Sequence, residues 1–110
     1  MDTHDADYCP HFHRAIELIG RRWTGAILKE MLGGRTRFSD IRSAVPGLSD
    51  RLLSERLKEL DELGVVERCT EVGDVQYHLT DLGRQIEPVL ESVGVWAQQL
   101  STVSPLDLEE

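Results

Sequence analysis

The sequence predicts a mainly α fold with a small β-hairpin, an α+β class, in one domain that spans residues 1–110. Several segments repeat apolar residues every three or four positions, which is the period of an amphipathic helix. Two short valine-containing segments flank a Gly-Asp pair, and this pattern is typical of a tight hairpin. A chain of 110 residues with 40% hydrophobic and 29% charged residues supports a single modest core.

The first two predicted helices are short, and each ends at glycine. Residues 9–20 form the first, because Pro10 suits a first helical turn and Gly20 suits the end. Its apolar residues at helical spacing are Phe12, Ala15, Ile16 and Ile19. The second helix covers residues 24–32 and stops at a Gly-Gly pair.

Residues 38–63 are expected to form two helices joined by a tight turn. Ser39 is expected to cap the first, short helix, which Pro46 terminates. Ser49 is expected to cap the second helix, and Gly64 follows its end. Four leucines at helical spacing define the inward side of this second helix: Leu53, Leu57, Leu60 and Leu63.

A hairpin and a long helix complete the predicted fold. Residues 65–79 form the two strands, and a Gly-Asp pair makes the turn between them. Residues 80–101 form the last helix, in which Pro88 should produce a kink or loosen one turn. Residues 104–110 are expected to be a flexible tail. The apolar stripe of the last helix consists of Leu82, Ile86, Val89, Leu90, Val93, Trp96, Ala97 and Leu100.

This order of elements is the layout of a winged helix-turn-helix, with the hairpin as the wing. The layout predicts a partner, double-stranded DNA. The net charge of −8 is unusual for a DNA-binding protein. However, residues 21–58 contain nine basic and four acidic residues, a local charge of +5. Because salt screens distant charges, this local excess matters more to DNA than the total does.

The chain also resembles the HxlR-type regulators, which are related to the MarR-type winged-helix proteins. The resemblance extends from Cys9 to about Trp96 and rests on five blocks of sequence. These are Cys9-Pro10, GRRWTGAIL at 20–28, RFSDIR at 37–42, PGLSDRLLSERLKELDELGVVER at 46–68 and YHLTDLGR at 77–84. The resemblance implies a homodimer built from the helices at 9–20 and 80–101, bound to a roughly palindromic operator near promoters.

The wing departs from the family pattern. Family members usually carry a longer wing with a Pro-Pro-Arg-like segment before the second strand. Here residues 71–75 link the strands, and this link is short, has two acidic residues and lacks that arginine. DNA binding is therefore expected to depend more on the second helix of the motif, the recognition helix.

The residues expected to contact DNA lie on and around that helix. With the leucines inward, Arg51 points outward one turn inside the N-terminus, where its guanidinium can reach guanine. Lys58 is expected to reach a phosphate, and so is Ser39 at the start of the preceding helix. The full predicted set is Arg37, Ser39, Arg42, Ser49, Arg51, Ser54 and Lys58. The alternative is an amphipathic helix whose charged residues face only solvent.

A dimer interface is predicted from apolar surface that one chain cannot cover. The stripe on the last helix is too wide for packing on the other helices alone, and Phe12 and Ile16 also need cover. The predicted interface residues are Phe12, Ile16, Ile86, Val89, Leu90, Val93, Trp96 and Leu100.

Cys9 is the candidate sensor residue. It lies at a helix N-terminus and four residues before His13. The helix dipole and a nearby imidazole both favour a thiolate. The resemblance adds that several HxlR-type members use a cysteine at this position to sense oxidants, quinones or other electrophiles. The alternative is a small packing residue. Cys69, in the first strand of the hairpin, is expected to be structural.

Other classes of function find no support in the sequence. His11 and His13 alternate along a helix and point apart, and no second ligand pair at zinc spacing occurs, so no metal is expected. No cofactor and no catalytic residues are predicted, so the chain is not expected to be an enzyme.

With no secretory signal or membrane-spanning run, a cytoplasmic location and no membrane partner are expected. The remaining alternative is a winged-helix protein-interaction module without DNA binding, which the −8 charge and acidic wing favour.

Overall fold

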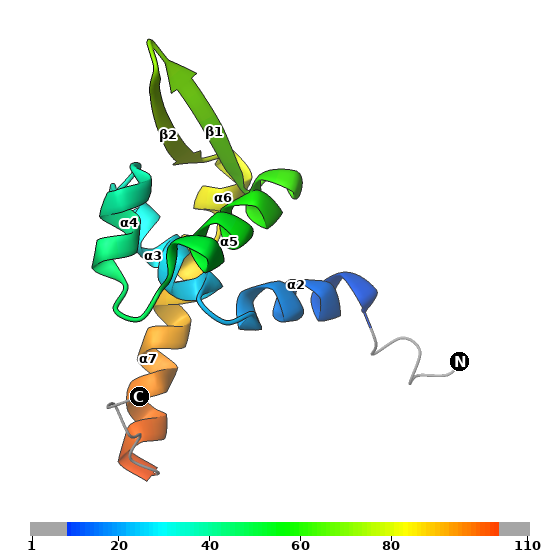
Figure 1. Cartoon of the computed structure of the whole chain (residues 1–110). Coiled ribbons are helices and arrows are strands. Elements are labelled where there is room, and N and C mark those ends of the chain that lie inside the picture. The colour runs from blue at the N-terminus through cyan, green and yellow to red at the C-terminus, as the bar shows by residue number, and fades with distance from the viewer. Residues whose placement is uncertain (1–8, 104–110) are drawn as a thin grey trace.

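The computed structural model describes residues 9–103, and the predicted tail at 104–110 lies outside the described residues. The predicted fold class is confirmed, because the described residues are mainly helical and form one two-stranded antiparallel hairpin, which projects from the helical body in Figure 1. The elements are α2 (Pro10–Gly20), α3 (Thr24–Leu32), α4 (Phe38–Ala44), α5 (Asp50–Glu62), β1 (Val66–Glu71), β2 (Asp74–Leu79), α6 (Asp81–Arg84) and α7 (Glu87–Val103).

The core lies between α3, α4, α5 and the base of the hairpin. Its buried apolar residues are Ile27, Leu28, Met31, Ile41, Val45, Leu48, Leu53, Leu57, Leu60, Val66 and Leu79. Three of the four leucines predicted to face inward from α5 are therefore buried. The fourth, Leu63, is exposed, because it follows the end of α5 and lines an open cleft instead of the core.

The two serines predicted as caps behave differently. Ser49 caps α5 as predicted, and its Oγ accepts a hydrogen bond from the Leu52 N–H at 3.1 Å. The prediction for Ser39 is wrong. The helix α4 begins one residue earlier, at Phe38, and Arg37 occupies the cap position without a side-chain hydrogen bond. Ser39 is therefore an exposed residue within the first turn of α4.

The hairpin turn lies one residue earlier than the Gly-Asp pair indicated. Val66 pairs with Leu79 and Glu71 with Asp74, which leaves Val72 and Gly73 as the two turn residues. Both have positive φ, 51° and 79°, as a tight two-residue hairpin requires. Asp74 is thus the first residue of β2, and this position brings its carboxylate next to α4.

The predicted last helix is divided into α6 and α7. Gln85 and Ile86 form a turn between the two helices, and Pro88 becomes the second residue of α7. Proline is well tolerated there, because an N–H in the first helical turn has no partner within the helix. In Figure 1, α7 projects from one side of the body and α2 from another. No described helix is long and apolar enough to cross a membrane.

Candidate DNA-binding surface

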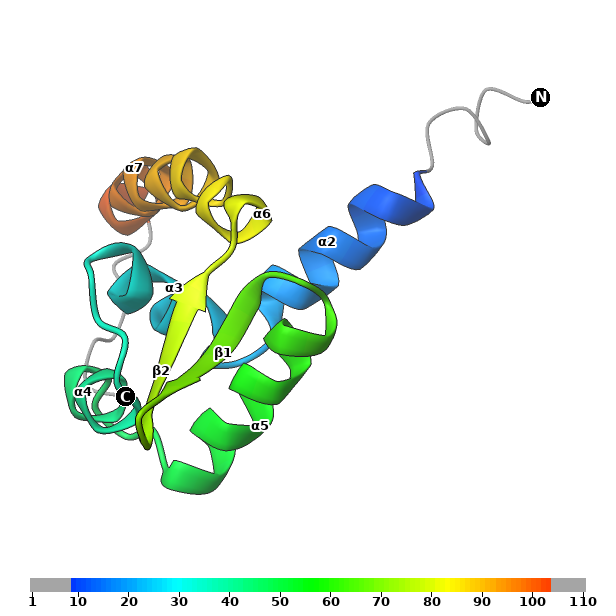
Figure 2. The same ribbon diagram turned by 90° about the horizontal axis from the view of Figure 1, so that it is seen from above.

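The elements that carry the predicted DNA contacts lie on one side of the molecule, together with the tip of the hairpin. In Figures 1 and 2, α4, the tip of the hairpin and the first turn of α5 share a side that α2 points away from. An ion pair from Arg42 Nε to Asp50 Oδ1, 2.8 Å long, joins the end of α4 to the start of α5. A second, from Arg37 Nη1 to Asp74 Oδ1, joins the start of α4 to the hairpin at 2.5 Å.

The outward face of α5 carries Arg51, Ser54 and Lys58, and all three are exposed. The side chain of Arg51 is 81% exposed, and its Nη1 lies 3.5 Å from Glu55 Oε2 one turn later. Lys58 makes no ion pair within the part of the chain that the structure describes. An exposed arginine near the N-terminus of such a helix has the reach to contact base edges in a major groove.

Carboxylates make this surface less positive than the local charge of +5 implies. Each of Arg37, Arg42 and Arg51 is paired with an aspartate or a glutamate. The hydrogen bond from Arg37 holds the pKa of Asp74 below its ordinary value, and Asp74 in turn raises the pKa of Arg37. All three pairs are exposed and therefore weak in water. A DNA phosphate can take the place of the carboxylate in each of them.

A polar network that the sequence did not indicate holds the hairpin against the segment before α4. The Thr36 hydroxyl donates to Gln76 Oε1 at 2.8 Å, and Gln76 Nε2 donates to Asp74 Oδ2 at 3.0 Å. The Tyr77 N–H donates to the Thr36 carbonyl at 2.8 Å. Together with the pair between Arg37 and Asp74, these bonds fix the hairpin beside α4.

Cys9 occupies the N-cap of α2 and is exposed. Its Sγ accepts a hydrogen bond from the Phe12 N–H at 3.4 Å. His13 Nε2 lies 3.2 Å from Glu17 Oε2, one turn further along α2. Cys69 lies in β1 and is partly buried. Among the described residues, no group of three or more His, Cys, Asp or Glu side chains is placed to hold a metal ion.

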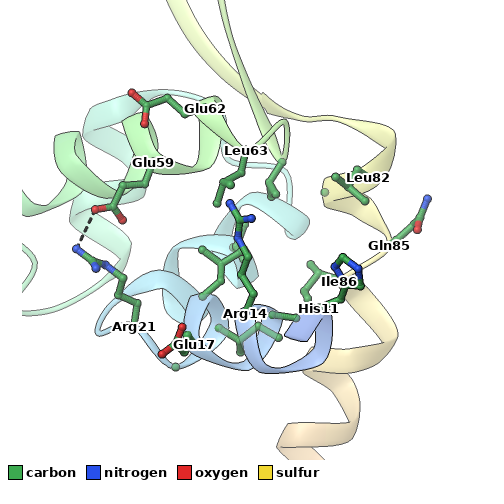
Figure 3. Close-up of a pocket in the computed structure, with 17 residues that line it drawn as sticks. His11, Arg14, Glu17, Arg21, Glu59, Glu62, Leu63, Leu82, Gln85 and Ile86 are labelled. Carbon is green, nitrogen blue, oxygen red and sulfur yellow. Dashed lines mark hydrogen bonds and ion pairs between the residues drawn. The ribbon is translucent and has the colours of Figure 1, made fainter. Parts of the chain in front are cut away.

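A large open cleft separates α2 from α6 and the end of α5. It has a volume of about 1280 Å³, and Figure 3 shows His11 and Arg14 of α2 facing it together with Leu63, Leu82 and Ile86.

The residues predicted at a dimer interface divide into two groups. The exposed group is Phe12, Ile16, Val89, Val93 and Trp96, and the half-buried group is Ile86, Leu90 and Leu100. Ile86 and Leu90 pack partly against the core of their own chain.

Comparison with known proteins identifies the family of this fold. The model of the HxlR-like helix-turn-helix family matches residues 18–104. The chain belongs to this family. It is therefore a helix-turn-helix transcriptional regulator with a winged-helix fold.

The relatives that the chain resembles include bacterial regulators. The chain is 42% identical over 106 residues to YvaP, an uncharacterized HTH-type transcriptional regulator of Bacillus subtilis, and this covers 93% of the chain and 97% of YvaP. The reduced form of the regulator YodB from B. subtilis superposes with a TM-score of 0.79 at 34% identity, covering 91% and 99% of the two chains. Quinone-bound YodB matches with a TM-score of 0.73 at 36% identity over 84% and 99%. The redox regulator HypR in its reduced form gives 0.75 at 30% identity over 84% and 95%.

Proposed function

We propose that the chain acts in the cytoplasm as a homodimer that binds a roughly palindromic operator, with α5 of each protomer in a major groove. The observation that carries this proposal is the outward N-terminal half of α5, where Arg51 is the most exposed arginine of the surface. The proposed contacts from around it are Arg37, Ser39, Arg42, Ser49, Ser54 and Lys58. In this proposal the chain regulates transcription and catalyses no reaction.

The homodimer is supported by apolar surface on α2 and α7. Phe12 is 65% and Trp96 is 63% exposed in the single chain. Exposed apolar surface of this kind usually marks an interface, and soluble homo-oligomers are most often two-fold dimers. The two recognition helices of such a dimer are expected to lie one helical turn apart, about 34–36 Å.

DNA binding is tested with duplexes from upstream of the gene, at stated salt, by fluorescence anisotropy. Replacing Arg51 with alanine should cost about 1–3 kcal/mol and relax the preference at one base position in each half-site. Lys58→Ala should weaken binding to all sequences alike and flatten the salt dependence. Lys29→Ala is the matched control, because it removes an exposed positive charge from α3, outside this surface.

Two outcomes would contradict the proposed DNA contacts. If Arg51→Ala and Lys58→Ala both bind as wild type does, α5 is not the reading helix. If wild type binds no DNA, the chain is a protein-interaction module instead. The net charge of −8 and the carboxylates beside Arg37, Arg42 and Arg51 are the observations that favour this second function.

We also propose that oxidants or electrophiles regulate the protein through Cys9. The exposed thiol at the start of α2 and the likeness to quinone-bound YodB support this proposal. With a quinone, the Cys9 thiolate would add to a ring carbon, forming a C–S bond, and the ring would take up a proton as it becomes a hydroquinone thioether. No group leaves, and the quinone accepts the electron pair. Because α2 is also a proposed dimer helix, the adduct would change how the two recognition helices fit an operator.

Mass spectrometry and DNA binding together test the role of Cys9. Cys9 should react with a thiol probe faster than Cys69 near neutral pH, because Cys69 is partly buried. Quinone should change the operator affinity of wild type and of Cys69→Ser, but not of Cys9→Ser. Unchanged affinity after complete modification of Cys9 would make it a packing residue.

A further inference from the structure

The segment between α2 and α3 makes polar contacts with the middle of α5. Arg21 Nη2 donates to Glu59 Oε2 at 2.8 Å, the bond drawn as a dashed line in Figure 3. Arg56 Nε donates to the carbonyl oxygen of Arg22 at 2.9 Å. Arg56 Nη1 lies 3.6 Å from the same Glu59 oxygen that Arg21 contacts. Glu59 thus connects two arginines, one from each side of this contact.

Arg56 is the least expected member of this group. Its side chain is only 9% exposed, although the other charged residues of the recognition helix, apart from Glu59, are exposed. Burial of a guanidinium is costly unless the charge is paired. Here the Arg22 carbonyl and Glu59 offset part of that cost, while Nη1 has no hydrogen-bond partner in the described part of the chain. None of the proposed DNA contacts uses Arg56 or Glu59.

Apolar burial contributes little to the position of α2. This helix contains no buried residue, and Leu18, near its end, packs only partly against the core. Trp23 is the last residue of the segment between α2 and α3, with a φ of 79°. Its ring reaches the turn between α4 and α5, where a Cβ on Gly47 would lie 3.1 Å from Trp23 Cη2. The segment after α2 therefore contacts both the turn and α5, the two parts that orient a recognition helix.

We propose that Arg21, Arg56 and Glu59 form a joint that sets the angle between α2 and α5, and thereby the half-site spacing that the dimer accepts. The first part depends on contacts within one chain, and the part about spacing rests on the proposed homodimer on a palindromic operator. If α2 is held by the partner protomer, the angle at this joint fixes how far apart the two recognition helices lie. Arg56 and Glu59 are then positioning residues, which act on DNA recognition without touching DNA.

The joint itself is tested in the absence of DNA. Spin labels are attached to Cys9, at the start of α2, and to Ser54→Cys on the exposed face of α5, with Cys69→Ser to avoid a third label. Labelled protein is diluted with unlabelled protein so that distances within one protomer dominate. Pulsed electron paramagnetic resonance should give a narrow distance distribution in this background and a clearly broader one after Glu59→Gln. An equally narrow distribution after Glu59→Gln would overturn the joint.

Two further variants keep this measurement decisive. Glu62→Gln is the matched control, because Glu62 is an exposed glutamate one turn further along α5 and makes no ion pair among the described residues. It should leave the distribution unchanged. If Glu59→Gln fails to fold, Arg21→Gln replaces it, since the Arg21 side chain is half exposed and its loss leaves the contact of Arg56 intact. A distribution as narrow as that of the background in Arg21→Gln would equally overturn the joint.

The effect on spacing is tested with duplexes that contain the half-site selected by wild type from a random-sequence pool. Changing the spacing between the two half-sites by one base pair should lower the DNA affinity of wild type and of Glu62→Gln by about tenfold, because the recognition helices no longer match successive grooves. Glu59→Gln should bind the original spacing nearly as well as wild type does. Its affinity for duplexes with the altered spacing should fall by less than about threefold. Discrimination equal to that of wild type would overturn the role in spacing. If wild type binds no DNA, the proposed function and this role both fail, while the distance measurement still decides whether the joint exists.

Discussion

The central body and the two end helices use the same sequence pattern for different purposes. In α3, α4, α5 and the base of the hairpin, apolar residues at regular spacing are buried, as Leu53 is at 0% exposure. In α2 and α7 similar spacing leaves no buried residue, and Phe12 and Trp96 remain about two-thirds exposed. The body is thus stabilised by its own core. The end helices present surface whose burial requires a second molecule.

The largest effect is expected from a cavity in the body. Leu53→Ala removes a fully buried side chain and should lower the free energy of unfolding by about 2–5 kcal/mol, measured by urea denaturation at fixed protein concentration. Val93→Ala in α7 is the comparison, because Val93 is about half exposed within one chain. A cost for Val93→Ala that equals the cost for Leu53→Ala, and does not depend on protein concentration, would show that α7 belongs to the core after all.

The same glycine substitution should have opposite effects in α6, beside the base of the hairpin, and in α7. Gly83 of α6 is buried, and a Cβ there would lie 2.1 Å from the Val65 carbonyl oxygen, so Gly83→Ala must displace backbone. We expect a loss of about 1–3 kcal/mol in the free energy of unfolding. A Cβ on Gly94, inside α7, meets nothing within 4 Å in the single chain. Gly94→Ala should therefore stabilise the protein by up to about 1 kcal/mol through helix propensity. Thermal unfolding of both variants at one concentration provides the check.

Trp96→Ala should affect assembly more than folding. Tryptophan is a frequent hot spot at interfaces, so its loss should raise the dimer dissociation constant about tenfold or more. The far-ultraviolet circular dichroism of the protomer should not change. Analytical ultracentrifugation over a range of concentrations measures the constant, and Gln98→Ala, an exposed polar residue two positions further along α7, is the control. Wild type that remains monomeric at micromolar concentration would remove the proposed interface altogether.

Local rules predicted much of the body. The leucine spacing in α5 and the cap at Ser49 depend on residues within one helix, and both predictions agree with the structure except at Leu63. The same rules failed at Ser39. There the segment before α4 is held by the hydrogen bond from Tyr77 to Thr36, some 40 residues away, and the helix starts at Phe38.

Contacts between distant segments were not predictable from the sequence. Arg56 and Glu59 look like an ordinary surface pair three residues apart, and only the fold brings the Arg22 carbonyl and Arg21 to them. For the same reason the sequence did not show that Asp74 would neutralise Arg37. Nor does spacing alone distinguish an apolar residue that faces the core, such as Leu90, from its exposed neighbour Val89.

The smallest expected effect concerns the hairpin, which exposed polar contacts hold to the body. Because Arg37 lowers the pKa of Asp74 in the folded protein, this pair stabilises the fold fully above the unfolded-state pKa of an aspartate, about 3.9. The contribution is lost as the pH falls through the lower pKa of the folded state. In an NMR titration of the Asp74 carboxyl carbon, Arg37→Gln should return the pKa toward its ordinary value, whereas Arg42→Gln should not.

The same titration separates the hairpin's two attachments to the body. When Asp74 becomes protonated, its bond with Arg37 weakens, but the backbone bond from Tyr77 to Thr36 has no group that titrates. The protection factor of the Tyr77 amide in hydrogen exchange should therefore change little through this pH range, while the Arg37 side chain becomes more mobile. If the amide loses protection together with the protonation of Asp74, the ion pair holds the whole hairpin in place. Arg37 would then be needed to position the wing, and Arg37→Gln would weaken DNA binding through the hairpin as well as through a lost phosphate contact.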